Sequence, residues 1–72
     1  MAKWINFVLI KEGEKTNVWQ VNTKNKSEPL GLIKWFPGWR KYALFPYGNT
    51  VYENECLKDI AAFIELQMRL RR

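Results

Sequence analysis

The residue types that could bind a ligand gather in one short segment, residues 34–42, with the sequence KWFPGWRKY. Three cations stand among four aromatic residues within these nine positions. Cationic side chains neutralise phosphates, and exposed aromatic rings stack on bases for about 1–3 kcal/mol each. The segment therefore predicts a binding site for an anionic partner, above all nucleic acid. Its candidate residues are Lys34, Trp39, Arg40, Lys41 and Tyr42.

A second interpretation applies to the same aromatic residues, because a small domain needs large side chains for its only core. At strand spacing, aromatic residues are more often core than ligand platform. This interpretation is the stronger one for Trp35, whereas the two are balanced for Trp39. The cations also have an alternative, since long side chains can extend into water and Arg40 can rest on Trp35 in an internal cation–π contact.

The residue types that the chain lacks exclude the common catalytic and metal sites. It has no His, one Cys (Cys56) and one Ser (Ser27), so no Ser/His or Cys/His pair can form within it. Zinc sites need about four Cys or His ligands. We therefore expect no enzymatic activity, no metal and no cofactor. A single thiol forms no internal disulfide, which indicates a reducing compartment and predicts a cytoplasmic location.

Length and charge narrow the class of protein further. A chain of 72 residues buries too little surface for two cores, so residues 1–72 are predicted to form one domain. Twelve Lys and Arg residues against seven Asp and Glu residues give a formal net charge of +5, which favours an anionic partner. The longest apolar run, residues 7–10, is far shorter than the roughly 20 residues that cross a bilayer, and no signal-peptide pattern follows Met1. No membrane partner is expected.

Four strands and one helix must position the candidate residues. Runs of β-branched and aromatic residues separated by turn residues predict strands at residues 4–11, 17–23, 30–36 and 39–45. From Asn54, which is a suitable cap, the apolar period becomes helical up to about residue 70. The apolar stripe of this helix consists of Leu57, Ile60, Ala61, Ile64 and Met68, widened by Cys56, Phe63 and Leu70, and Cys56 is expected to be buried.

Burying both the sheet and the helix requires packing one against the other. The expected fold is therefore α+β (β-β-β-β-α), a four-stranded antiparallel sheet at residues 4–46 packed on one C-terminal helix at about residues 54–70. The opposite sheet face then remains open to solvent or to a partner. Three further cations, Arg69, Arg71 and Arg72, stand at the end of the helix, where they could contact phosphates or simply be solvated.

The Pro-Gly dipeptide at residues 37–38 predicts the turn between the third and fourth strands. With a two-residue loop, Trp35 faces Arg40 and Lys34 faces Lys41. Like charges directly opposite each other destabilise a sheet, so these two ammonium groups must reach solvent or meet an anion. Because Pro-Gly favours a type II turn whereas tight hairpins prefer primed turns, a longer loop remains an alternative. We expect Lys34, Arg40 and Lys41 to form one cationic patch near this turn.

The second half of the chain resembles a group of small uncharacterised phage and prophage proteins with the pattern LGxIKW…WRxYxFxP…CLxDIxxFI. The pattern is matched at residues 30–35, 39–46 and 56–64. Ala43 stands where these proteins often carry Cys, and Leu44 replaces an aromatic residue, which changes packing without affecting a site. The resemblance implies a phage or prophage origin and a shared fold, but no activity.

Two functions from different classes follow. The first is a small basic module that binds DNA or RNA through the open sheet face. The predicted architecture is similar to the DNA-binding domains of plant ethylene-response factors and the amino-terminal domains of some transposon integrases, which bind DNA through an open sheet face. The alternative is a phage-type adaptor or inhibitor that binds a host protein through exposed aromatic residues. A homodimer formed through an edge strand would use the same surface.

Overall fold

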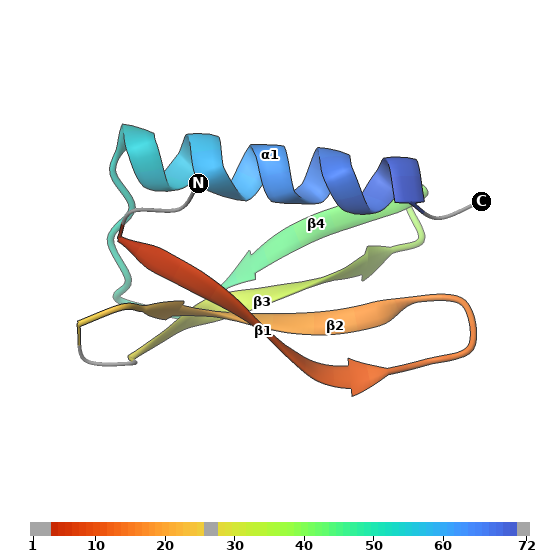
Figure 1. Cartoon of the computed structure of the whole chain (residues 1–72), viewed down its shortest axis with the longest axis horizontal. Coiled ribbons are helices and arrows are strands. Elements are labelled where there is room, and N and C mark those ends of the chain that lie inside the picture. Colours follow the sequence, from red (N-terminus) through yellow and green to blue (C-terminus); the bar gives the residue numbers. More distant parts are fainter. Residues whose placement is uncertain (1–3, 26–27, 71–72) are drawn as a thin grey trace.

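Five elements build the part of the chain that the computed structural model describes, residues 4–25 and 28–70. The strands are β1 (Ile5–Glu12), β2 (Asn17–Thr23), β3 (Pro29–Phe36) and β4 (Lys41–Pro46), and the helix is α1 (Asn54–Leu70). The strands lie in the order β1-β2-β3-β4, each antiparallel to the next. Figure 1 shows α1 lying across one face of this sheet. The predicted α+β class with one C-terminal helix is confirmed.

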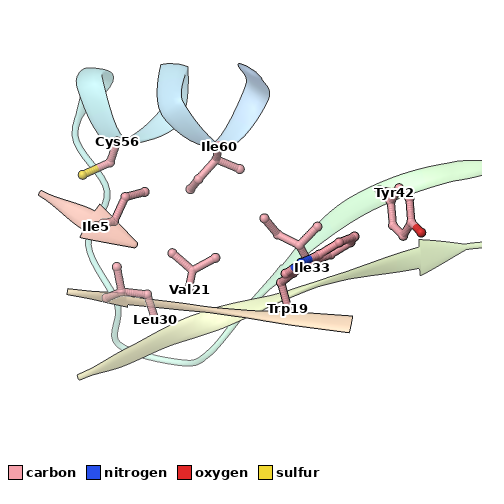
Figure 2. Packing of buried hydrophobic residues seen from close by; sticks show 8 residues of the cluster. All are labelled: Ile5, Trp19, Val21, Leu30, Ile33, Tyr42, Cys56 and Ile60. Atoms are coloured by element: carbon pink, nitrogen blue, oxygen red, sulfur yellow. The ribbon is translucent and has the colours of Figure 1, made fainter. Parts of the chain in front are cut away.

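The core lies between α1 and the sheet face turned toward it. Side chains alternate between the two faces of a strand, and Trp19, paired with Ile33, points toward the helix. Figure 2 shows Cys56 and Ile60 reaching down from α1 toward these strand residues. The buried side chains are Ile5, Trp19, Val21, Leu30, Ile33, Tyr42, Cys56 and Ile60.

The turn between β3 and β4 holds four residues, 37–40, because the closing pair of the hairpin is Phe36 and Lys41. The N–H groups of Trp39 and Arg40 both donate to the Phe36 carbonyl, at 3.2 and 3.0 Å. Arg40 has a φ of 55°, the left-handed conformation with which loops built on a type I turn return to the sheet. The two-residue loop is therefore wrong, and β4 begins two residues later than predicted.

The longer loop changes which residues face each other across the hairpin. Trp35 pairs with Tyr42, and Lys34 pairs with Ala43. The expected pairing of Lys34 with Lys41 is therefore wrong. The two lysines share a face as diagonal neighbours, a placement that typically separates Cα atoms by about 7–8 Å and weakens the repulsion between like charges.

The cap of α1 stands one residue earlier than expected. The carbonyl of Glu53 accepts from the Leu57 N–H at 3.0 Å, and its carboxylate accepts from the Cys56 N–H at 2.6 Å. These two bonds define an N-cap residue, so Glu53 takes the role predicted for Asn54. Its negative charge also suits the positive end of the helix dipole.

The buried stripe of α1 is narrower than the predicted one and is centred on the side that carries Cys56, Ile60 and Phe63. Cys56 and Ile60 are buried, and Phe63 stacks on an aromatic ring of β1 with 4.1 Å between ring centroids. Leu57 is 50 % exposed, and Ala61 is also exposed. The stacked rings turn the helix so that its Phe63 side, not its Leu57 side, meets the sheet. Within residues 4–25 and 28–70, no helix combines the length and the apolar character needed to cross a membrane.

Gly31 lies where two other segments approach β3 closely. A Cβ atom at this position would lie 2.8 Å from the Phe45 carbonyl oxygen, 2.9 Å from the Pro46 Cα and 3.2 Å from the Tyr52 hydroxyl. That hydroxyl donates to the Leu30 carbonyl at 2.7 Å, which ties the segment before α1 to the sheet. Only glycine, which has no Cβ, leaves room for both the β4 backbone and the Tyr52 hydroxyl.

Gly31→Ala is expected to lower the free energy of unfolding by about 1–3 kcal/mol, since overpacking against backbone atoms forces strands apart. Gly48→Ala is the matched control, because nothing lies within 4 Å of a Cβ at that position. Its effect should stay within about 0.5 kcal/mol. Urea unfolding measures both values. Equal midpoints for the two variants would contradict the close approach at Gly31.

Cys56 is buried and forms no disulfide, as expected. Burial, together with a hydrogen bond from the thiol to Glu53, raises the pKa of Cys56 above its ordinary value. Because the thiolate is the reactive form, a thiol reagent should modify the native protein slowly, and the rate should rise sharply across the urea transition. Reaction in native buffer as fast as in urea would place the thiol at the surface.

Candidate binding surface

The sheet face turned away from α1 is open (Figure 1). One cross-strand row on this face consists of Val8, Gln20, Leu32 and Phe45, three of which are apolar. The polar member, Gln20, donates from Nε2 to the Asn22 Oδ1 at 2.9 Å. These two amides therefore satisfy part of each other's hydrogen-bonding capacity, and the row presents mainly apolar atoms.

Four side chains continue this surface toward the β3–β4 turn through a chain of direct contacts. The Nζ of Lys34 lies 4.7 Å from the centroid of the Phe45 ring. Phe45 and Phe36 meet at 6.1 Å between centroids, and Phe36 and Trp39 at 4.8 Å, both edge to face. We call these four residues the hairpin patch. Edge-to-face contacts favour defined ring orientations, so Trp39 is held in place although 69 % of it is exposed.

Tyr42, one of the predicted site residues, lies on the other face of the sheet. It is 4 % exposed and meets Trp19 and Trp35 edge to face, at 5.3 and 5.5 Å between ring centroids. Its hydroxyl accepts from the Asn17 N–H at 3.2 Å. Tyr42 is therefore a core residue and cannot offer its ring to a partner at the open face. Trp35 is half-buried against it, as the core interpretation expected.

The three predicted cations stay together at the β3–β4 hairpin. Lys34 belongs to the hairpin patch, and Lys41 is exposed at the first pair after the turn. Arg40 is exposed in the turn itself, beside Trp39. Arg40 is not the strand partner of Trp35, because Trp35 pairs with Tyr42 and the four-residue loop keeps Arg40 out of β4. All three cations therefore lie within three residue pairs of the turn.

The end of α1 brings a further cation to this end of the molecule. Lys41 and Arg69 border the same cavity, of about 390 Å³, between β4 and the last turns of the helix, with Ile64, Glu65 and Met68 completing its lining. Figure 1 shows the C-terminal end of α1 lying over the β3–β4 hairpin. Of the predicted basic helix end, Arg71 and Arg72 lie outside the described residues.

Phe36 and Phe45 were not among the predicted site residues, although they connect the others. A signal for Phe36 exists in the sequence, because strand alternation places it on the same face as Lys34. The same alternation separates Tyr42 from Lys41 and could have excluded it. No comparable signal exists for Phe45, since its contact with Lys34 depends on the register across the hairpin.

The chain is similar along almost its whole length to a phage protein. It is 34 % identical over 72 residues to an "Uncharacterized 9.3 kDa protein" of Acholeplasma phage L2, and the match covers 99 % of this chain and 92 % of that protein. No family model matches the chain. No solved structure matches it significantly. The phage relative agrees with the phage-type origin that the sequence pattern implied.

Proposed function

Because the chain belongs to the same family as the 9.3 kDa protein of Acholeplasma phage L2, we propose that it is a phage-type, non-enzymatic module that binds nucleic acid through its open sheet face. The hairpin patch is the observation that carries this proposal. Its Trp39 ring is exposed and meets the Phe36 ring, and its cation Lys34 suits a phosphate, as do the exposed Arg40 and Lys41 next to the patch. Phosphate neutralisation and base stacking are two of the interactions by which proteins bind nucleic acid.

Lys34 is prepared for a phosphate contact by its packing. Its ammonium group is held over the Phe45 ring, a contact worth about 0.5–1 kcal/mol at an exposed site. A long side chain that is already ordered loses less entropy when it binds. The net charge of +5 adds a long-range attraction that raises the rate of encounter with a polyanion.

A host protein is the second candidate partner, and the exposure of Trp39 beside Arg40 favours it. Trp and Arg are enriched among residues that dominate protein interfaces. The two partners differ in how binding responds to salt. Each phosphate contact releases counterions and contributes about 0.7–0.9 to the slope of log K against log salt concentration, whereas an aromatic protein interface depends on salt only weakly.

Lys41→Ala is expected to weaken binding similarly for all nucleic-acid sequences and to reduce the salt slope by about 0.7–0.9, the loss of one phosphate contact. Fluorescence anisotropy of labelled DNA and RNA oligonucleotides, titrated at several salt concentrations, measures the slope. Lys58→Ala is the matched control. Lys58 is exposed on α1 midway between Cys56 and Ile60 in sequence, hence on the side of the helix away from the sheet.

The outcomes separate the proposed partners. A steep slope for the parent and for Lys58→Ala, with a shallower one for Lys41→Ala, supports nucleic-acid binding at the hairpin. If the parent binds neither DNA nor RNA at low salt, the proposal is overturned. If the salt slope of Lys41→Ala equals that of Lys58→Ala, Lys41 makes no phosphate contact.

A further inference from the structure

We infer that the nucleic acid taken by the open face is single-stranded, with one base stacked on Trp39 and the sugar-phosphate backbone held by Lys34 and Lys41. This inference rests on the function proposed above and specifies its substrate class. Three features of the open face carry it: the exposure of an apolar ring, the apolar surface that adjoins this ring, and the nearness of rings and cations at the hairpin.

The exposed indole suits a base whose face is free. In a duplex, each base face is covered by its neighbours, and the grooves present polar base edges. In a single strand, bases can splay out and stack on protein rings. Trp39 is 69 % exposed, its ring meets Phe36, and its backbone N–H donates to the Phe36 carbonyl at 3.2 Å. The ring is therefore positioned before a ligand arrives.

Apolar side chains dominate the part of the open face that adjoins the hairpin patch. Reading a duplex groove requires donors and acceptors that reach the bases. Val8, Leu32 and Phe45 are apolar, and Gln20, the polar member of their cross-strand row, donates to Asn22 at 2.9 Å. The exposed Asn6, paired with Asn22, adds an amide to this face at the end away from the β3–β4 turn. This part of the face therefore favours stacking over base-edge readout, and binding there should show little sequence preference.

The nearness of rings and cations at the hairpin suits a polynucleotide whose bases and phosphates are both accessible. Lys34 stands beside Phe45, and Lys41 is paired with Phe36, next to the turn that carries Trp39. Lys34 thus lies beside the rings of the open face, and Lys41, which also borders the cavity next to α1, stands at the edge of the same hairpin. An extended single strand presents both bases and phosphates to one surface, whereas a duplex presents phosphates on its outside and keeps its base faces inside.

The test compares one mixed sequence of about 16 nucleotides, within the site size of small single-strand-binding folds, as single-stranded DNA, as single-stranded RNA and as duplex DNA. Anisotropy titrations of the full chain at one low salt concentration should show at least tenfold tighter binding of one single strand than of the duplex. The DNA and RNA arms show which sugar the site prefers, since stacking and phosphate contacts are common to both.

Trp39→Ala should weaken single-strand binding about tenfold or more, whereas Trp39→Phe should keep most of the affinity, because any aromatic ring can stack. Tyr47→Ala is the matched control. Tyr47 is another exposed aromatic residue, 40 % exposed, and it follows the opposite end of β4. Urea midpoints of the three variants close to that of the parent show that the losses do not arise from unfolding.

Two contrary results remain distinguishable. If the duplex binds as tightly as the single strands, or if Trp39→Ala binds single strands as tightly as Tyr47→Ala, the single-strand inference is overturned and nucleic-acid binding itself still stands. If neither single strands nor the duplex bind at low salt, both the inference and the proposed function fail.

Discussion

A single helix can cover only one face of a four-stranded sheet, and this constraint shapes every strand of the protein. On the covered face, Val21 and Ile33 reach zero exposure beneath α1, with Ile60 packed above them. The other face has no helix to pack against, so its larger side chains must pack on one another. The Phe36–Phe45 contact and the ammonium group of Lys34 over Phe45 are that lateral packing.

The β3–β4 hairpin carries ring contacts on both faces, and this gives the candidate site a firm support. On the face toward α1, Tyr42 contacts Trp19 and Trp35 edge to face and accepts a hydrogen bond from the β2 backbone. On the open face, the Phe36 ring meets the Trp39 ring edge to face. A binding group held by locked neighbours loses less entropy when it meets a ligand than one on a free loop.

The position of α1 depends on the short segment between β4 and the helix. The Tyr52 hydroxyl binds the Leu30 carbonyl across the space that Gly31 leaves free, and the next residue, Glu53, caps the helix. The chain is therefore fastened to the sheet immediately before the helix begins. The stacking of Phe63 on Phe7 then sets the rotation of α1 about its axis. Both contacts join residues that are distant in the sequence.

The positions of the strands and the helix could be predicted from the sequence, because side-chain periodicity is a local property. The sequence predicted β2 and α1 at their observed bounds, the α+β class and the burial of Cys56 and Ile60. It also predicted which cations gather at the third hairpin. The length of the loop at residues 37–40, the cap at Glu53 and the exposure of Leu57 on α1 could not be predicted, because they depend on how the folded segments pack on one another.

The same division holds for the candidate site. Residue types and spacing pointed to Lys34, Trp39 and the neighbouring cations, but placing Tyr42 in the core and joining Phe45 to Lys34 required the strand register. The reason is physical. A register, a helix rotation and the exposure of a ring are set by contacts between segments that pack only in the folded chain, and local preferences favour several arrangements almost equally.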